Sequence, residues 1–406
     1  MTCKILGYVI AKNSWPTLGL SLVHAFRMGC QHVIVVNHQS TDATSSQLEK
    51  FKSLWQDRLT IINLDLKPFL QETTKKIILG GFDSDLYDWI YVFDSDEFLL
   101  TQSEQSLADI LQSIPENVDA VRYQIDQWVV PQDLDDLDVD QYIRIKQRAC
   151  PHNLSQQSIE LIRKKLIAGN INYFDIEFPS KVIVRGRFHR KLSAGAHFIS
   201  SVTEIKEKML SSQIIRCAHL PFLSKRHLAN KAMHGKNEIE SGFSLDHAWQ
   251  NKVLYQLNLA GQLDSFWQRH SVSKLNQPAV SAGYPTLIED DALAVAVYDT
   301  INEFKKIITI DKCQNQIKTL TKFHEVRLKN IISKVWLADN EYKNQINEHK
   351  NQINEYNNQI NEILNSTSWK VSLPIRIIGN FFRKITIFAK FFGGILNELK
   401  SKMIDK

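Results

Sequence analysis

Three acidic residues stand within four positions directly after a run of aromatic and β-branched residues. The segment, residues 89–98, reads WIYVFDSDEF. A run of this kind suits a buried strand, so carboxylates at its end need a positive partner. An Asp-x-Asp pair such as Asp94 and Asp96 brings two carboxylates close enough to bind one hard divalent cation, and oxygen ligands suit Mg²⁺ or Mn²⁺. The expected partner is therefore a metal ion that carries a diphosphate. The alternative is that Asp96 or Glu97 caps the next helix.

The residues before these acids alternate between strand-like and helix-like patterns. Short apolar runs predict strands, and proline or capping residues near the start of a segment predict helices. The expected strands cover residues 5–11, 33–36, 59–66 and 89–93, and the expected helices cover residues 16–29, 41–51 and 71–80. This order predicts a parallel sheet covered on both faces. Ligands bind beyond the carboxyl ends of the strands in such sheets, which is where Asp94 and Asp96 fall.

The alternation is looser after residue 101. Strand patterns cover residues 118–130, 181–184 and 214–221, with an acidic loop at 131–141, and His219 lies near the end of the last strand. Residues 224–260 and 289–336 have mainly helical patterns. The expected fold class is therefore α/β, with a helical region that follows the sheet.

Composition and charge exclude several classes of protein. The 406 residues are 43% hydrophobic and 23% charged, which is typical of a globular protein with more than one folding unit. Residues 364–406 carry a net charge of +6, whereas the whole chain carries +5, so residues 1–363 carry −1. Residues 1–363 therefore lack the excess of positive charge that is typical of nucleic-acid-binding proteins. The five cysteines are scattered without a C-x-x-C pair, so neither a disulfide framework nor a zinc site is expected.

Two patterns mark the carboxyl-terminal part of the chain. Residues 344–364 contain three heptads, NQINEHK, NQINEYN and NQINEIL, with isoleucine at every a position. They predict a short coiled coil that joins copies of the chain, although a polar spacer is the alternative. After Pro374, apolar residues recur every three or four positions and cations gather on another face, which predicts a basic amphipathic helix on an anionic membrane surface. Packing on the body or on a partner is the alternative. No uninterrupted apolar run reaches 18 residues, so no transmembrane helix is expected.

Three metal-phosphate chemistries are compatible with the Asp-x-Asp pair. An aspartyl-phosphate phosphatase is disfavoured because the acids do not follow the first strand and no partner lysine motif is found. A two-metal nuclease is disfavoured because residues 1–363 are nearly neutral and offer no basic channel. Glycosyl transfer from a nucleotide-sugar remains, in which a cation stabilises the departing nucleoside diphosphate.

Five segments together resemble the GT-A glycosyltransferases of the family 2-like branch, akin to family 92. They are VIAKN (9–13), VIVVNHQSTDAT (33–44), DWIYVFDSDEFLL (88–100), KVIVR (181–185) and CAHLPFLSKRHLANKAMHGK (217–236). The resemblance covers about residues 1–250. It implies a Rossmann-like fold that binds a nucleotide-sugar, a Mn²⁺ or Mg²⁺ ion, and transfer of one sugar to an acceptor hydroxyl.

By position, Asp94 resembles the acid near the donor ribose and the metal, and Asp96 the principal metal ligand. His219 resembles the histidine that completes the metal site in many of these enzymes, although a structural histidine is the alternative. We expect three cations to face the diphosphate, namely Lys225, Arg226 and Lys231. The alternative is that they form a solvated face of a helix.

The donor-site candidates from the first two strands are Asn13, Asn37 and Asp42. The sequence departs from the family here, because Asn13-Ser14 stands where many relatives have Asn-Glu, and Asn37 where many have Asp. Asn37 still hydrogen-bonds a base edge but carries no charge. We expect a UDP-linked donor, while Asp42 is alternatively a helix cap.

Relatives in this branch mostly invert the anomeric centre, which requires a carboxylate that takes the acceptor proton. Glu97, Asp126 and Asp246 are the candidates, with Glu97 and Asp246 preferred. The sequence does not decide which of these carboxylates is the catalytic base.

The segment STSWK (366–370) with the following LPIR (373–376) resembles bacterial transferases that build surface polysaccharides. We therefore expect lipopolysaccharide or capsule-type glycan synthesis in the bacterial cytoplasm, on the inner face of the membrane. The expected organisation is a GT-A domain (1–275), a helical extension (276–338), a coiled coil (339–365) and a membrane-associating tail (366–406). A non-catalytic transferase-like scaffold on a stalk, or another metal-dependent phosphotransferase, are the alternatives.

Overall fold

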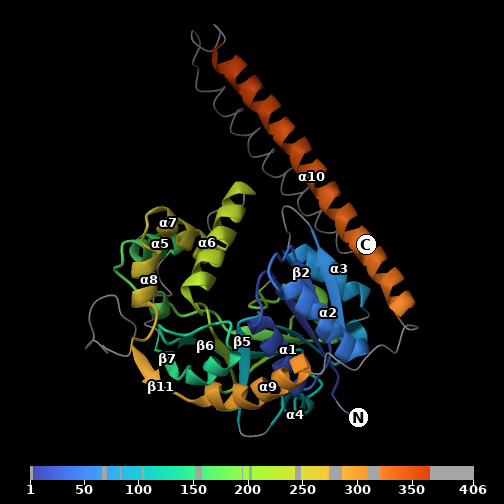
Figure 1. The fold of residues 1–406 in the computed structure, drawn as a ribbon. Helices are drawn as coiled ribbons and strands as arrows, with labels where there is room; N and C mark the ends of the chain where they lie inside the picture. Colours follow the sequence, from blue (N-terminus) through green and yellow to red (C-terminus); the bar gives the residue numbers. More distant parts are fainter. Residues whose placement is uncertain are drawn as a thin grey trace. The chain divides into compact units, whose positions relative to one another are not determined.

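The computed structural model of the protein is drawn in Figure 1. It describes residues 3–65, 71–82, 84–102, 105–150, 158–193, 195–200, 204–242, 248–273, 286–309 and 321–365. The chain divides into two compact units, Met1–Trp336 and Leu337–Lys406. The acids of the sequence motif lie in the first.

The amino-terminal part is a parallel sheet in the order β3-β2-β1-β4. Its elements are β1 (Ile5–Ala11), α1 (Thr17–Arg27), β2 (Cys30–His38), α2 (Thr44–Trp55), β3 (Leu59–Leu64), α3 (Gln71–Gly81) and β4 (Trp89–Val92). The predicted alternation of strands and helices is confirmed, with shifts of a few residues at the element ends.

Alternate residues of the parallel strands pack into two separate cores. In β2, Val33 and Val35 join the core that includes α1 and α2, while Ile34 and Val36 join the core that includes α3. Successive side chains of a strand point to opposite faces, so an uninterrupted apolar run is buried on both. The predicted covering of both faces is confirmed, and it leaves the strand ends as the exposed polar edge.

The sheet continues from β4 as an antiparallel extension in the order β8-β6-β7-β11. The added elements are β5 (Glu97–Thr101), α4 (Leu107–Gln112), β6 (Ala120–Val129), β7 (Gln147–Ala149), α5 (Ile159–Ile167), β8 (Lys181–Arg185), β9 (Glu207–Met209), β10 (Ile215–His219) and β11 (Leu287–Glu289). Strands β6, β8 and β10 confirm the three strand patterns of the sequence. The short strands β5, β7, β9 and β11 were not predicted. A 3-10 helix covers Val139–Arg144 and so begins within the predicted loop 131–141.

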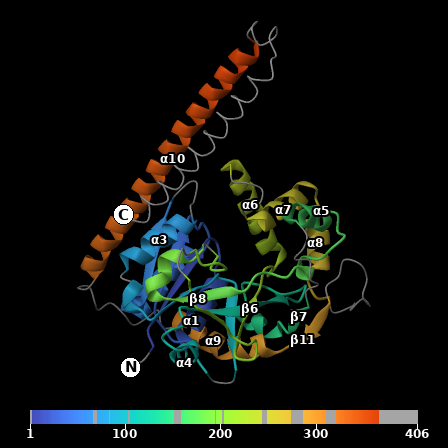
Figure 2. The same ribbon diagram turned by 180° about the vertical axis from the view of Figure 1, so that it is seen from behind.

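Helices follow β10, as the sequence pattern indicates. They are α6 (Lys225–Glu240), α7 (Trp249–Leu259), α8 (Leu263–Arg269), α9 (Ala292–Thr309) and α10 (Thr321–Asn365). In Figures 1 and 2, α5 to α8 gather at one end of the sheet, and α2 and α3 lie at the other. Helix α9 packs against α1, and Arg27 pairs with Asp299 at 3.0 Å.

The second unit contains the heptad repeats within α10. Ile346, Ile353 and Tyr356 are exposed along this helix, so the predicted coiled coil remains a prediction about a second copy. The predicted amphipathic tail, residues 366–406, lies outside the described residues. Within the described ranges, every helix is too short or too polar to cross a membrane. Among the described residues, Cys3, Cys30, Cys150 and Cys217 are free thiols.

Candidate functional site

A cavity of about 1310 Å³ lies at the carboxyl ends of the parallel strands. Residues that follow β1, β2, β3 and β4 line one side, and α6 lines the other through His227, Asn230, Lys231 and His234. These α6 positions follow the spacing i, i+3, i+4 and i+7 and so share one face of the helix. The strand ends contribute Asn13, Asn37, Asn63, Asp94 and Asp96 among others. The cavity is thus where ligands bind in open α/β sheets.

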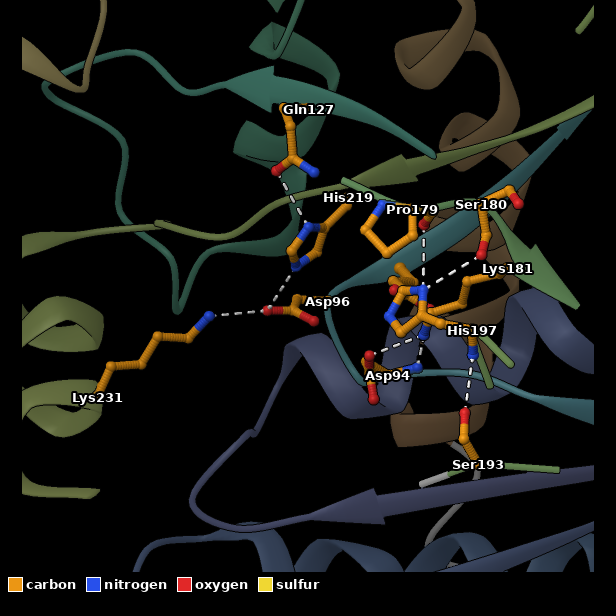
Figure 3. Close-up of polar contacts among 11 residues, drawn as sticks. Asp94, Asp96, Gln127, Pro179, Ser180, Lys181, Ser193, His197, His219 and Lys231 are labelled. Atoms are coloured by element: carbon orange, nitrogen blue, oxygen red, sulfur yellow. Dashed lines mark hydrogen bonds and ion pairs between the residues drawn. The ribbon is translucent and has the colours of Figure 1, made fainter. Parts of the chain in front are cut away.

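The acids after β4 find cations within the chain itself (Figure 3). Nζ of Lys181 lies 2.8 Å from Oδ2 of Asp94 and 2.6 Å from Oε2 of Glu97. Lys181 and Glu97 are buried, whereas Asp94 is partly exposed and lines the cavity. Burial raises the pKa of Glu97 to about 7 although Lys181 opposes that shift. Glu97 does not line the cavity in this structure, and its carboxylate instead accepts the backbone N–H of Asp94.

Asp96 lies between a histidine and a second lysine. Its Oδ2 is 3.7 Å from Nε2 of His219 and 3.1 Å from Nζ of Lys231, as Figure 3 shows. Burial raises the pKa of Asp96, but Lys231 and His219 outweigh burial and hold the pKa well below its usual value. Asp96 is therefore ionised at neutral pH.

Two neighbouring strands position His219. Strand β10 pairs with β5, which sets His219 opposite Glu97, and with β6, which sets it opposite Gln127. Nδ1 of His219 lies 3.1 Å from Oε1 of Gln127, so Gln127 holds one edge of the imidazole ring. Nε2, on the opposite edge of the ring, lies 3.7 Å from Oδ2 of Asp96. Metal-binding histidines commonly have such an outer hydrogen-bond partner on the second ring nitrogen.

The side chains at this point fit a divalent cation in part. Mg²⁺ binds its ligands at about 2.1 Å, so two ligands of one ion lie up to about 4.2 Å apart. Asp96 and His219 meet this limit. In the described part of the chain, however, no three His, Cys, Asp or Glu side chains form a group that could hold an ion. Asp94, the third residue of the predicted set, is paired with Lys181 in this structure, so the set of Asp94, Asp96 and His219 stays a prediction.

The opposite end of the cavity carries amide side chains. Asn37 is buried, and its Nδ2 donates to Ser45 and Asn63 at 2.8 Å each. No described group donates to its Oδ1. Asn13, with a positive φ of 51°, accepts the backbone N–H of Thr41 at 2.7 Å and so joins the loops after β1 and β2.

Other predicted residues lie outside the cavity. Asp42 accepts the backbone N–H of Thr44 at the start of α2, and it does not line the cavity. Lys225 pairs with Asp264 at 2.5 Å, also outside the cavity. Asp126 is buried and pairs with Arg216 at 3.0 Å. Asp246 lies outside the described residues.

Arg226 and Asp136 form an ion pair of 2.8 Å at a small neighbouring cavity beside Asp96. Arg226 therefore lines the small cavity with Asp96 and does not line the main cavity. Asp136 neutralises its charge.

The cavity lining is predominantly acidic. Two lysines, Lys12 and Lys231, face six carboxylates, which are those of Glu49, Asp65, Asp94, Asp96, Glu238 and Glu240. Burial lowers the pKa of His227 to about 3 and that of His234 to about 4, so these α6 histidines are neutral. A diphosphate that entered this lining alone would meet net negative charge.

Sequence reasoning missed Lys181 as a site residue. Strand β8 pairs with β4 so that Arg185 faces Trp89 and Val184 faces Ile90. Continuing this register brings Lys181 to the end of β4, beside Asp94. The sequence does show a lysine as the first residue of an apolar strand. It does not show that this strand pairs with β4, which is what brings Lys181 to Asp94.

Comparisons with known proteins add a weak likeness. No family model and no curated protein matches the sequence. Similar solved structures include S. aureus TarS residues 1–349, alone (TM-score 0.31, covering 61% of this chain and 69% of that chain) and in complex with UDP (0.29, 65% and 72%). A further TarS structure gives 0.31, with 65% of this chain and 44% of that chain. Identity is 15% in each case. Likeness at this level does not establish a shared fold.

Proposed function

We propose that the protein is a GT-A-type glycosyltransferase that moves a sugar from a UDP-linked donor to an acceptor hydroxyl. The observation that carries this is one cavity at the carboxyl ends of four parallel strands, with a buried unpartnered amide oxygen at one end and Asp96 at the other. His219 does not line the cavity but lies 3.7 Å from Asp96. The first suits a base and the second a cation with a diphosphate.

The amide oxygen of Asn37 is the proposed base contact. Uracil offers an N–H donor on its pairing edge, and an acceptor with no other partner stabilises such a donor more than one already bonded. Asn63 holds the Asn37 amide in this orientation. Asn13 supports the same end by fixing the loop after β2, and Asp42 acts through the start of α2.

Asp96 and His219 are the residues proposed to hold Mn²⁺ or Mg²⁺, with phosphate oxygens as further ligands. When bound, the ion would stabilise the negative charge of the departing nucleoside diphosphate. Asp94, fixed by Lys181, is proposed to lie near the donor ribose and the metal. An inverting reaction needs a carboxylate base; Asp246 remains a prediction, and Glu97 would have to leave its buried pair with Lys181 to act.

The setting is proposed from the carboxyl-terminal segments. The STSW and LPIR segments support an acceptor in bacterial lipopolysaccharide or capsule-type glycan, and the basic amphipathic pattern supports attachment to the inner face of the cytoplasmic membrane.

Binding of nucleoside diphosphates in the presence of Mn²⁺ tests this function. We expect UDP to bind more tightly than GDP or CDP by calorimetry, and Asp96→Asn to weaken UDP binding at least about 10- to 100-fold, since a metal ligand is lost. Glu49→Gln, which removes another cavity carboxylate, is the matched control and should retain binding. If UDP fails to bind, or if Asp96→Asn releases sugar from a UDP-sugar at the rate of the wild type, the assignment is wrong.

A further inference from the structure

The ammonium group of Lys231 occupies the side of Asp96 that faces the cavity. Nζ of Lys231 lies 3.1 Å from Oδ2 of Asp96 and 2.7 Å from the carbonyl oxygen of Pro221. The lysine comes from the middle of α6, across the cavity from the strand ends. In Figure 3 its extended side chain reaches Asp96 from the side opposite to Asp94.

The same carboxylate oxygen serves both Lys231 and the proposed cation site. Oδ2 of Asp96 is also the atom that lies 3.7 Å from Nε2 of His219. A divalent ion bound there would lie next to the ammonium, and two positive charges at one oxygen repel each other. Lys231 and the ion therefore compete for Asp96.

The cavity also needs a cation on the diphosphate side. Only Lys12 and Lys231 among its described lining residues are lysines, against six carboxylates. The side chain of Lys231 is 23% exposed and has a flexible four-carbon stem, so its ammonium can change partner without movement of α6. Once displaced from Asp96, it is still inside the cavity.

We propose that Lys231 is an exchangeable counter-ion, which neutralises Asp96 in the donor-free protein and transfers to the donor diphosphate when a divalent cation takes Asp96. This rests on the proposed function, because it assumes a nucleoside diphosphate and a cation at this site. It gives Lys231 opposite effects on the two ligands: it weakens the binding of the cation alone and strengthens the binding of the diphosphate.

Lys231→Met tests the exchange, because methionine keeps the length of the side chain and removes the charge. We expect Mn²⁺ alone, measured by electron paramagnetic resonance of the free ion, to bind about five- to tenfold more tightly to Lys231→Met than to the wild type. UDP at saturating Mn²⁺, measured by calorimetry, should bind at least about fivefold more weakly. Lys231→Arg keeps the charge and should behave like the wild type in both measurements.

Lys225→Met is the matched control. It removes a positive charge from the same helix, but Lys225 pairs with Asp264 outside the cavity. Both affinities should stay within about twofold of the wild type. In an Asp96→Asn background, Lys231→Met should no longer tighten Mn²⁺ binding, because the shared carboxylate is gone.

The outcomes separate this inference from the proposed function. If the wild type binds UDP with Mn²⁺ but Lys231→Met leaves the Mn²⁺ affinity unchanged or lower, the counter-ion role is wrong and the function stands. If Lys231→Met tightens Mn²⁺ binding but no nucleoside diphosphate binds to the wild type, the transfer to diphosphate and the proposed function both fail. Absence of Mn²⁺ binding to both proteins also overturns the exchange.

Discussion

Lys181 is one ammonium group shared by two carboxylates. It is buried with Glu97, while Asp94 extends to the cavity. In a buried cluster, the attraction between opposite charges offsets the free-energy cost of removing each charge from water. If one member is lost, the remaining charges keep that desolvation cost without the attraction that offsets it. The cluster thus fixes the backbone and side chain of Asp94 from behind the site.

Lys181→Met should lower the free energy of unfolding by about 3–5 kcal/mol, because it leaves Glu97 buried without its cation. Urea denaturation at pH 7.5 measures this. The double variant Lys181→Met/Glu97→Gln should recover part of the loss, since no buried charge remains. Lys208→Met, on the exposed strand β9, is the control and should change stability by less than about 0.5 kcal/mol. Equal losses in the single and double variants would contradict the compensation.

At this scale the sequence predicted the acids and His219 but not their partners. The type and position of Asp94 and Asp96 follow from a strand that ends in carboxylates. Lys181 and Lys231 reach them through strand register and helix orientation, which single-sequence patterns do not specify. The predicted metal ligands stay a prediction.

At the scale of elements, a buried histidine joins α1 to its neighbours. Nε2 of His24 donates to the carbonyl oxygen of Leu99 in β5 at 2.8 Å, and Nδ1 lies 3.4 Å from Oγ1 of Thr300 in α9. Burial lowers the pKa of His24 to about 4. In the unfolded chain the pKa of His24 is about 6.5. As the pH falls, the unfolded chain therefore binds a proton at a higher pH than the folded protein does.

The pH dependence of stability has a defined sign. The contribution of His24 is present above pH 6.5 and is lost as the pH falls from 6.5 toward 4. Between pH 7.5 and 5 we expect a loss of about 2 kcal/mol from this group. His24→Gln keeps a donor for Leu99 but does not titrate, so its urea-derived stability should fall less over the same range. If both proteins show the same slope, His24 does not remain neutral in the folded state.

Element prediction succeeded where burial determines the pattern. The parallel strands are apolar on both faces, so β1 to β4 and their helices were readable from residue type. Strands β7, β9 and β11 have three residues each, which is too short for a periodic signal. Their pairing with β6 and β7 depends on the tertiary structure.

At the scale of the whole molecule, the binding cavity and the carboxyl-terminal segments belong to different parts of the chain. The cavity is lined by residues up to Asn251, in the first unit, and the tail begins after α10. Removal of the tail should therefore leave the cavity intact. The coiled coil, the tail and the membrane remain predictions from sequence patterns.

A chain that lacks residues 371–406 should lose binding to anionic vesicles and retain UDP binding. Burial of the apolar stripe, together with about 1 kcal/mol for each cation near the surface, should give strong but salt-sensitive attachment of the full chain. Co-sedimentation with phosphatidylglycerol vesicles at low and high salt measures it, and phosphatidylcholine vesicles are the control. The membrane role is wrong if the full chain ignores anionic vesicles at low salt, or if the truncated chain unfolds.

The double pairing of β10 has a consequence for hydrogen exchange. Its backbone is bonded to β5 on one edge and β6 on the other, so Cys217 and Ala218 lie inside the sheet. Their amide hydrogens exchange with solvent only when that sheet opens. Helix α6, which lines the cavity across from the strand ends, buries Leu228 and Ala232. The amides of Cys217 and Ala218 should therefore be among the slowly exchanging ones, which hydrogen-exchange measurements detect.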